Sequence, residues 1–444
     1  MEMPICKECN QENYGWWCKP CNSKHFQNDF NNWTSGNDKI DKFIQDAQLN
    51  ADRNWQVIEW IPYDGFKDVK QIGKGGFGTI HYARWIDGCI EKWDIENQQW
   101  KRYYENSEVA LKKFDNFVNF NDVLNEMEIH LKSYTKSASI RFYGITQDPE
   151  TLSYMMVLDY ATDGNLREYL KINFNNINWK QKLLNLYRLS ENLKNIHKLD
   201  IIHQDFHPGN ILSYDFKNLI YISDFGLSKL IGANPNNPEK KNIFGVLPYI
   251  APEVLSGEEY AKAADVYSFG IIVYEMVTGF PPYPDIPHDK DLAIKICNGL
   301  RPKIPFHTPK LITRMIMRCW DARVTNRPTF KELEDELDKY WEDYRDYLEE
   351  GKNKDSEIVI QIKKAEEFSA NQESTNSTTT TTTTPLNYQT HPQAIYTSRL
   401  LNYSKLPKPK NEENFEKELE ELTESMSNLC PSDSGIVDLD MSNF

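Results

Sequence analysis

Residues 201–210 read IIHQDFHPGN, and residues 223–228 read SDFGLS. In the first stretch Asp205 follows a short apolar run and Asn210 stands five positions later, while in the second Asp224 precedes a phenylalanine and a glycine. Phosphoryl transfer requires a carboxylate that orients the attacking hydroxyl and side chains that hold metal ions on the phosphates. Asp205 suits the first task, and Asn210 and Asp224 suit the second. This order of residues favours a phosphoryl-transfer site.

A glycine-rich stretch lies upstream. IGKGGFGTI (72–80) places Gly73, Gly75 and Gly78 in the spacing G-x-G-x-x-G. Because glycine has no side chain, the backbone N–H groups of such a loop can approach phosphate oxygens closely. The spacing alone is as consistent with a tight hairpin as with a nucleotide loop. It precedes a strand-like VALKK and not a helix, which argues against a dinucleotide-binding fingerprint.

A lysine and a glutamate complete the candidate phosphate site. Lys112 lies in VALKK and can pair with nucleotide phosphates, although a single lysine is more often a solvated charge. The helical stretch NDVLNEMEIHLKS offers two carboxylates to hold it, Glu126 and Glu128. Glu126 is favoured because a helix that turns it inward also turns Ile129 and His130 toward the core.

These motifs occur in the order glycine loop, V-A-L-K, helical glutamate, H-x-D-x-x-x-x-N, D-F-G and A-P-E. In that order they resemble a eukaryotic protein kinase domain, and RCWDARVTNRP, with Trp320 and Arg327, resembles its tyrosine-kinase-like branch. The resemblance implies an α+β, bilobal fold with a small β-rich N-lobe containing one helix and a larger helical C-lobe. It also implies that ATP and Mg²⁺ are the cofactors, with Asn210 and Asp224 on the metal.

The resemblance implies further contacts. Arg327 would pair with Glu253 of the APE motif. Residues Leu158, Asp159, Tyr160 and Ala161 would form the hinge against adenine, with Asp159 and Ala161 facing the nucleotide. The adenine would lie between Ile80, Ala110 and Leu212.

Two departures from the kinase pattern bear on regulation and substrate. Gln204 replaces an arginine that many related kinases neutralise with an activation-loop phosphate. The segment from Lys229 to Pro248, KLIGANPNNPEKKNIFGVLP, contains no Ser, Thr or Tyr, so only Ser228 and Tyr249 remain nearby. We therefore predict that loop phosphorylation is not the switch.

The substrate residue is less clearly indicated. His207 and Val246 stand where serine/threonine kinases usually carry a lysine and a threonine, and the loop does not match the tyrosine-kinase pattern either. The resemblance to the tyrosine-kinase-like branch favours Ser/Thr over Tyr, with dual specificity left open.

The N-terminal cysteines indicate a metal site. Cys6, Cys9, Cys18 and Cys21 form two C-x-x-C pairs, a spacing typical of four thiolates around one tetrahedral zinc. A head of about 20 residues cannot form a stable core without a bound metal ion or another cross-link. We predict closed, structural Zn²⁺, with reduced or redox-active thiols as the alternative.

Composition changes along the chain predict its organisation. We expect a four-cysteine zinc-binding head over residues 1–22, a connector over 23–63 with a helix at IDKFIQDAQL, and the kinase domain over 64–345. Residues 346–410, which include seven consecutive threonines, are expected to be a disordered linker. The tail, 411–444, is expected to carry one amphipathic helix with Phe415, Leu419, Leu422 and Met426 on one face. The charged and aromatic stretch 89–106 is expected to be a long hairpin insertion.

The whole-chain composition limits the partners. With 51 Lys and Arg against 66 Asp and Glu, the net charge is −15, which disfavours nucleic acid and anionic membrane surfaces. No stretch is apolar and long enough to span a membrane. We expect an intracellular, cytoplasmic protein, with a nuclear location left open, whose partners are protein substrates and a protein bound by the zinc head or the terminal helix.

Three functions remain under consideration. The first is an active ATP-dependent protein kinase in intracellular signalling. The second is a nucleotide-binding pseudokinase adaptor, which is disfavoured because no catalytic group is missing. The third is a small-molecule kinase, which is disfavoured because the segment PYIAPEVL is intact. The head, connector and tail also resemble members of a large kinase family expanded in some symbiotic soil fungi.

Overall fold

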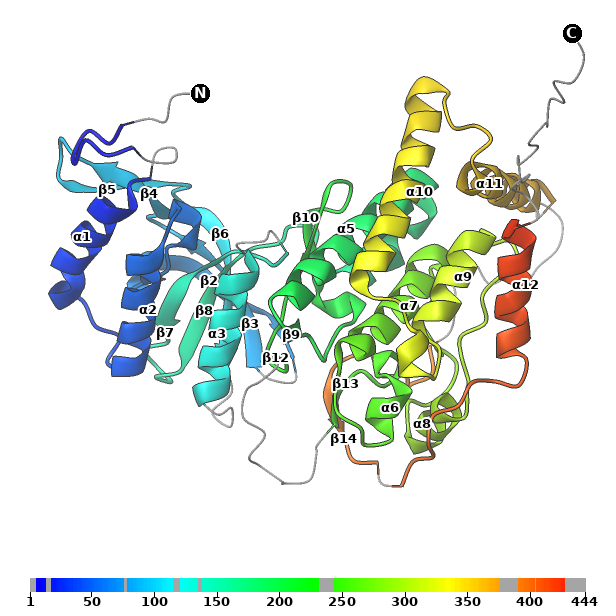
Figure 1. Ribbon diagram of the computed structural model, residues 1–444. Coiled ribbons are helices and arrows are strands. Elements are labelled where there is room, and N and C mark those ends of the chain that lie inside the picture. Colours follow the sequence, from blue (N-terminus) through cyan, green and yellow to red (C-terminus); the bar gives the residue numbers. More distant parts are fainter. Residues whose placement is uncertain are drawn as a thin grey trace, which may run out of the picture.

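The computed structural model describes residues 5–12, 17–75, 78–114, 120–134, 138–230, 243–375, 390–403 and 405–427. The chain folds into a smaller, sheet-containing N-terminal lobe and a larger, helical C-terminal lobe, joined near β8 and β10 (Figure 1). Within these ranges no helix is long and apolar enough to cross a bilayer. The predicted α+β, bilobal architecture is confirmed.

The N-lobe is built on one six-stranded sheet in the order β1-β7-β8-β6-β3-β2. All neighbouring strands are antiparallel except β1, which runs parallel to β7. The strands are β1 (Glu59–Trp60), β2 (Phe66–Lys74), β3 (Gly78–Trp85), β6 (Ser107–Phe114), β7 (Phe142–Gln147) and β8 (Tyr154–Asp159).

Strand β6 shows how the sequence positions the site. Its side chains alternate between the two faces of the sheet. Val109 and Leu111 are fully buried in an apolar cluster with Trp85, whereas Ala110 belongs to the cluster on the opposite face. Lys112 lies on the same face of the sheet as Ala110. Helix α3 (Phe120–Tyr134) covers this face.

The connector is part of the N-lobe. Helix α1 (Lys19–Asp29) crosses the predicted boundary between head and connector, and α2 (Asp38–Asn50) confirms the predicted helix. Ile40 and Ile44 of α2 are fully buried and share a cluster with Met127 of α3. The connector therefore packs beside the helix that carries Glu126.

The insertion at residues 89–106 contains the predicted hairpin. Strands β4 (Cys89–Asp94) and β5 (Gln99–Tyr103) pair antiparallel. Trp100 stacks on Trp17 and Phe26, with ring centroids 6.0 and 4.2 Å apart, and Trp93 stacks on His25 at 3.9 Å. The insertion is thus the surface on which the cysteine head packs.

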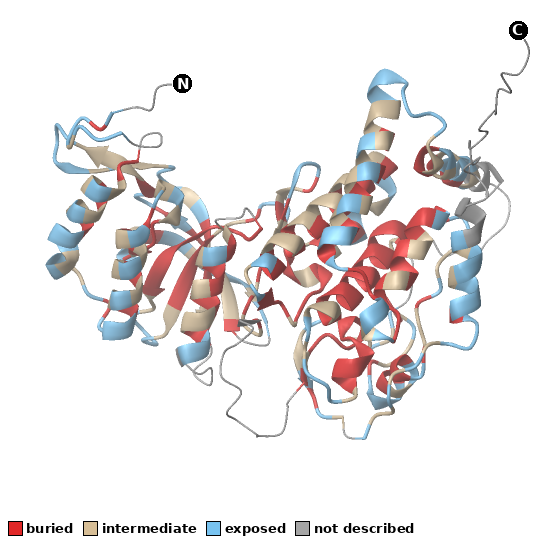
Figure 2. Ribbon diagram, viewed as in Figure 1, coloured by how far each residue is buried: buried red, intermediate tan, exposed pale blue. Residues whose placement is uncertain are grey.

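The C-lobe surrounds one central helix. Its helices are α4 (Leu166–Asn173), α5 (Trp179–Lys198), α6 (Pro252–Leu255), α7 (Lys262–Thr278), α8 (Lys290–Cys297), α9 (Lys310–Cys319) and α10 (Phe330–Glu350). Every residue from Ala264 to Thr278 is buried, so α7 is enclosed on all sides (Figure 2). A Cβ at Gly270 would lie 2.7 Å from the Cβ of Cys319, which shows how closely α7 and α9 approach.

Strands β9 to β14 form short pairs. Strand β9 (Ile201–Ile202) pairs with β12 (Lys229–Leu230), β10 (Ile211–Asp215) with β11 (Leu219–Ile222), and β13 (Ile243–Gly245) with β14 (Arg399–Leu401). The last pair joins the segment after the DFG motif to a strand near the C-terminus.

The prediction of a disordered linker over residues 346–410 is wrong for much of that range. Helix α10 continues to Glu350, and α11 (Glu357–Thr375) follows it. Ile358, Val359 and Ile362 of α11 are fully buried in the C-lobe core. Burial of these three side chains provides free energy that offsets the conformational entropy lost when α11 is ordered. The prediction assumed that the polar residues of 346–410 could not provide it. Residues 390–403 are also ordered against the C-lobe, and the threonine run lies outside the described residues.

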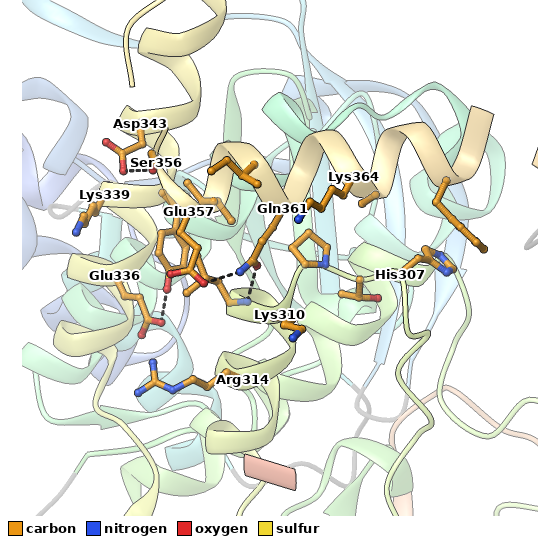
Figure 3. A pocket seen from close by; sticks show the side chains of 18 of the residues that line it. His307, Lys310, Arg314, Glu336, Lys339, Asp343, Ser356, Glu357, Gln361 and Lys364 are labelled. Carbon is orange, nitrogen blue, oxygen red and sulfur yellow. Dashed lines mark hydrogen bonds between the residues drawn. The ribbon is translucent and has the colours of Figure 1, made fainter. Parts of the chain in front are cut away.

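A cavity of about 1000 Å³ lies between α9, α10 and α11 (Figure 3). At its wall, Gln361 accepts a hydrogen bond from Leu311 N at 2.9 Å and donates one to Glu357 at 2.8 Å. None of the predicted site residues lines this cavity, so it is separate from the predicted phosphoryl-transfer site.

The terminal helix docks on the C-lobe. Helix α12 (Phe415–Ser427) lies beside α9 (Figure 1). Phe415 is buried, Leu419 and Leu422 pack against the core, and Arg314 of α9 donates to Thr423 at 3.2 Å. The predicted amphipathic helix is confirmed; the side chain of Met426 and residues 428–444 lie outside the described residues.

Candidate active site

The three glycines of the glycine-rich stretch lie where β2 and β3 meet, with Gly73 in β2 and Gly78 in β3; residues 76–77 lie outside the described residues. Gly75 N donates to Gly78 O at 2.9 Å, and Gly73 pairs with Ile80 across the two strands. A Cβ at Gly78 would lie 2.0 Å from the carbonyl oxygen of Lys113, so no other residue fits this position without moving the backbone. The glycine stretch is thus part of the β2–β3 hairpin, and its binding of a nucleotide stays a prediction.

Lys112 lies between two carboxylates. Its Nζ forms a hydrogen-bonded ion pair with Glu126 of α3 and another with Asp224 at 2.8 Å. Glu128 points elsewhere, is about half exposed and pairs with Lys132. Glu126, and not Glu128, is thus the carboxylate that contacts Lys112.

The charges of this group are strongly coupled. Burial acts to lower the pKa of Lys112, but the carboxylates of Asp224 and Glu126 outweigh burial and raise it overall. Burial acts to raise the pKa of Asp224, but Lys112 outweighs burial and lowers it to about 2. The lysine is therefore charged and Asp224 ionised near neutral pH.

Phe225 connects α3 to the loop that carries Asp205. Its ring is fully buried, 4.9 Å from His130 of α3 and 5.1 Å from His203. Burial and the nearby Lys112 lower the pKa of His130 to about 3, so its ring is neutral and packs as an apolar group. This stack fixes α3 in the position in which Glu126 reaches Lys112.

Asp265 of α7 holds the loop at residues 203–210. Its carboxylate accepts hydrogen bonds from the backbone N–H groups of His203 at 2.9 Å and Gln204 at 3.1 Å, and His197 Nε2 lies 2.9 Å away. Gln204 has a φ of +67°, a left-handed conformation that costs free energy in a non-glycine residue. Two hydrogen bonds to a buried carboxylate compensate for that cost.

Asp205 and Asn210 face each other within this loop. Asn210 Nδ2 donates to the backbone oxygen of Asp205 at 2.9 Å, and the backbone oxygen of Asn210 accepts from Ser223 N at 2.9 Å. The second bond ties the loop to the residue before Asp224. The loop therefore holds Asp205, Asn210 and Asp224 as one unit.

The residues predicted around adenine come from both lobes, with Ile80 and Ala110 on the N-lobe sheet and Leu212 on β10. Ala110 pairs with Leu158 across β6 and β8, and Leu212 forms an isolated bridge with Asn165. Asp159 receives a hydrogen bond from Tyr214 of the C-lobe at 2.7 Å, which ties the hinge to β10. Ala161 is buried.

The segment that follows the DFG motif is anchored at both described ends. The pair predicted between Arg327 and Glu253 is confirmed: two hydrogen bonds of 2.7 Å join them, and both side chains are buried. Ser228 is buried and donates to His203 O at 3.0 Å. Tyr249 is buried, donates to Glu275 and accepts from Arg167 at 2.8 Å. Residues 231–242 lie outside the described residues.

A comparison with models of protein families finds a match over residues 66–337 to the family described as protein tyrosine and serine/threonine kinase. The chain belongs to the protein kinase family.

Three curated relatives of this kinase are named as protein kinases, and one of the names specifies tyrosine. Tyrosine-protein kinase SPK-1 of Girardia tigrina is 28% identical over 294 residues, covering 64% of this chain and 55% of the relative. Stress-activated protein kinase alpha of Dictyostelium discoideum is 28% identical over 283 residues, covering 60% and 43%. A protein kinase and PP2C-like domain-containing protein of Arabidopsis thaliana is 32% identical over 224 residues, covering 44% and 34%. The chain thus spans about half or less of the length of these relatives.

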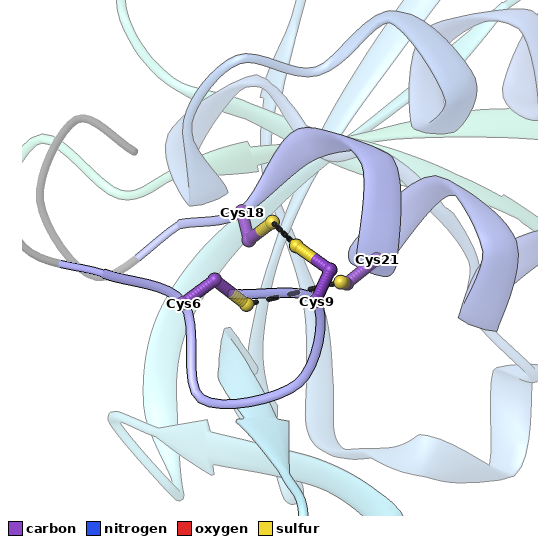
Figure 4. A group of neighbouring side chains, drawn as sticks. All are labelled: Cys6, Cys9, Cys18 and Cys21. Carbon is purple, nitrogen blue, oxygen red and sulfur yellow. Dashed lines mark hydrogen bonds between the residues drawn. The ribbon is translucent and has the colours of Figure 1, made fainter. Parts of the chain in front are cut away.

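The four cysteines of the kinase's head converge on one point (Figure 4). Their Sγ atoms all lie within 4.8 Å of one another, with 3.8 Å between Cys6 and Cys21 and 3.6 Å between Cys9 and Cys18. Zinc bonded to four thiolates at about 2.3 Å places the sulfurs about 3.8 Å apart. The donor set and its spacing therefore fit a tetrahedral zinc ion.

Sequence reasoning missed three residues of the kinase's site. Asp265 begins the stretch DVYSFG, and nothing in its local pattern indicates that it binds the loop at residue 203. His207 was noted only as a departure from the kinase pattern. Ser398 falls in the range predicted to be disordered, yet its Oγ donates to Asp205 Oδ2 at 2.5 Å and lies 3.1 Å from His207 Nε2. No local signal marks Ser398, because its contacts are long-range.

Proposed function

We propose that the chain is an active ATP-dependent protein kinase that transfers the γ-phosphate to serine or threonine hydroxyls of proteins, in intracellular signalling. One observation carries the proposal. Lys112 contacts both Glu126 and Asp224, while the carboxylate of Asp205 is hydrogen-bonded to a serine hydroxyl. Each group that the chemistry requires is present, which disfavours the pseudokinase adaptor.

In this proposal the residues divide the work as follows. Gly73, Gly75 and Gly78 cover the triphosphate, and Lys112, held by Glu126, pairs with its oxygens. Asn210 and Asp224 supply the amide and carboxylate oxygens that Mg²⁺ prefers, and magnesium, when bound, neutralises charge on the phosphates. Asp205 orients the acceptor hydroxyl and takes up its proton. Ile80, Ala110, Asp159, Ala161 and Leu212 hold the adenine.

The short distance between Asp205 and the backbone that passes it favours Ser/Thr specificity. The backbone that passes Asp205 is close enough for Ser398, whose hydroxyl is bonded directly to Cβ, to reach the carboxylate. A tyrosine on the same path would place its hydroxyl beyond Asp205. The resemblance to the tyrosine-kinase-like branch supports the same choice.

For the head, we propose a structural zinc ion bound by Cys6, Cys9, Cys18 and Cys21. All four coordination positions are then filled by protein, so the ion has no open position for a substrate. The head packs on the β4–β5 hairpin through Trp17 and Trp100. We further propose that the head or α12 binds a protein partner, that the kinase acts in the cytoplasm or nucleus, and that it is related to the kinases expanded in symbiotic soil fungi.

For regulation, we propose that phosphorylation of the activation loop is not the switch. The loop between Lys229 and Pro248 has no hydroxyl. The hydroxyls that flank it, on Ser228 and Tyr249, are buried and already hydrogen-bonded. A phosphate at either position would break these contacts and would find glutamine, not arginine, at position 204.

Two variants test the catalytic assignment. Asp205→Ala is expected to retain ATP binding and lose phosphotransfer, because nothing then orients the hydroxyl, and Lys112→Met is expected to be inactive. ATP binding is measured by calorimetry and phosphotransfer with radiolabelled ATP on a generic serine peptide. Undiminished transfer in both variants would refute the proposed mechanism.

A further inference from the structure

Residues 390–403, here called the C-terminal strap, lie across the C-lobe, and Ser398 within them contacts the Asp205 carboxylate. The strap is held by backbone contacts along its length: His391 N donates to Pro284 O at 2.8 Å, His288 N donates to Gln393 O at 2.9 Å, and Arg167 Nη1 donates to Tyr396 O at 2.8 Å. Tyr396 also donates through its hydroxyl to Pro282 O at 2.9 Å.

The end of the strap becomes a strand of the kinase domain. In β14, Arg399, Leu400 and Leu401 pair antiparallel with Gly245, Phe244 and Ile243 of β13. β13 belongs to the segment between the DFG and APE motifs, so the strap covers the surface on which an extended substrate would pair by β-strand addition. Figure 1 shows β14 alongside β13 at the edge of the C-lobe.

The hydroxyl of Ser398 has the polar neighbours that an attacking hydroxyl requires. Gly209 N donates to His207 Nδ1 at 3.0 Å, so in the neutral imidazole Nε2 carries the proton. That Nε2–H donates to Ser398 Oγ at 3.1 Å, and the Ser398 hydroxyl donates to Asp205 Oδ2 at 2.5 Å. The proton of Ser398 thus points at the proposed base, and one lone pair of its oxygen remains for a phosphorus atom.

The neighbouring hydroxyl does not share this environment. Thr397 is exposed, because successive side chains of an extended segment point to opposite sides. The same alternation separates Leu401, which is 4% exposed and packs in the C-lobe core, from Leu400, which is 40% exposed. The strap therefore has a defined register, and that register presents Ser398 alone to Asp205.

We propose that Ser398 is an autophosphorylation site that is modified within the same chain, and that the strap occludes the substrate groove until this happens. The proposal rests on the proposed kinase activity. In the transfer, Ser398 Oγ forms a bond to the γ-phosphorus of ATP, and the bond from that phosphorus to the β,γ-bridging oxygen breaks. The Ser398 proton passes to Asp205 and then to solvent, and the products are phosphoserine and ADP.

The product is incompatible with the seated strap. Phosphoserine carries close to two negative charges at neutral pH, and here it would stand beside the buried Asp205 carboxylate. Like-charge repulsion then favours release of the strap and opens the groove to other substrates. Helix α12 stays docked and keeps the strap tethered, so dephosphorylation allows it to return at a high effective concentration.

The first experiment uses the full-length chain, purified in phosphatase-treated form and incubated with ATP and Mg²⁺. Site-resolved mass spectrometry is expected to find phosphate on Ser398 and not on Thr397. The rate is expected to stay constant over an about hundredfold dilution, because the reaction is intramolecular. A rate that falls in proportion to dilution would overturn the assignment to the same chain.

A mixing experiment separates the chains directly. A Lys112→Met chain, which keeps the contact between Asp205 and Ser398, is incubated with the active wild-type chain and distinguished by mass. Its Ser398 is expected to stay unmodified while the wild-type Ser398 is phosphorylated. Equal modification of both chains would overturn the proposal.

The second experiment tests occlusion with matched variants of adjacent leucines. Leu401→Asp places a charge in the core and is expected to unseat the strap, whereas Leu400→Asp changes an exposed position. With a peptide copying residues 391–403 as substrate, Leu401→Asp should lower the apparent KM at least about tenfold before any preincubation with ATP, and Leu400→Asp should not. Wild-type protein should reach the lower KM after preincubation with ATP, and Ser398→Ala should not. Equal KM values in all four proteins would overturn the occlusion.

A generic serine peptide distinguishes a failure of the kinase proposal from a failure of the inference about the strap. If that peptide is phosphorylated and Ser398 is not, the kinase proposal stands and the inference about the strap is wrong. If neither is phosphorylated in protein that binds ATP, both fail.

Discussion

Replacing Glu126 by glutamine isolates the role of one carboxylate in the cleft. The change keeps the size of the side chain and removes its charge, so Lys112 loses one of two anionic partners and keeps Asp224 at 2.8 Å. A hydrogen bond to a charged group contributes about 1.5–3 kcal/mol. If that free energy holds Lys112 in its reactive position, its loss corresponds to a roughly tenfold to hundredfold lower kcat/KM. Because Asp224 still compensates the buried lysine, the loss of folding stability should stay below the about 3–5 kcal/mol of a fully broken buried pair.

Glu128→Gln is the matched control on the same helix. Glu128 and Lys132 form an exposed pair one helical turn apart, separated by 2.6 Å. Such pairs contribute about 0.3–0.5 kcal/mol, so activity should be unchanged. The assay is steady-state phosphorylation of a serine peptide, with ATP affinity and urea unfolding measured in parallel. Equal losses in the two variants would refute the assignment of Glu126, because they would show a general effect of charge on α3.

Two further predictions concern the head and the loop. Elemental analysis should find one zinc per chain. Cys18→Ser or a strong chelator should remove the zinc and change the tryptophan fluorescence, because Trp17 stacks on Trp100. Metal-free protein with an unchanged fluorescence spectrum would contradict the zinc proposal. Ser228→Ala should retain activity toward a peptide and the same activation by ATP as the wild type; a large loss of activity that tracks phosphate at Ser228 or Tyr249 would show that the loop is the switch after all.

Local spacing explains why much of the site could be predicted. Gly73, Gly75 and Gly78 lie in one hairpin, and Asp205 and Asn210 lie in one loop, so their order in the sequence fixes their proximity. The choice of Glu126 over Glu128 depended only on helical periodicity, which places Ile129 and His130 inward with Glu126. Both residues are fully buried, and Glu126 is the one that contacts Lys112.

Long-range contacts explain what could not be predicted. Ser398 stands 193 positions from Asp205, and the strand pairing that brings them together involves three residues on each side. The linker prediction failed because residues 346–410 were averaged as one composition. The threonine-rich part dominated that average, although Ile358, Val359 and Ile362 offered a buried face at helical spacing.

The packing of the head on the insertion at residues 89–106 also could not be predicted from the sequence. The stretch 89–106 contains Trp93 and Trp100 and offers no chemistry of its own, so its sequence indicates a hairpin and nothing more. In the structure those rings stack on His25 and Phe26 of α1. The aromatic residues on both segments were the available signal, but only the fold shows that they meet.

Gln204 connects the catalytic loop to the strap. In related kinases an arginine at this position pairs with a loop phosphate, and the same cation would attract a phosphate on a residue next to Asp205. With glutamine, neither a loop phosphate nor phosphoserine 398 has a cation at this position. In the proposed switch, no cation at position 204 compensates the repulsion between the phosphate on Ser398 and the Asp205 carboxylate. The strap is then released and not held in place. The substitution that removes one switch thus favours the one that we propose, in which the controlling hydroxyl lies on the strap, where Asp205 can reach it.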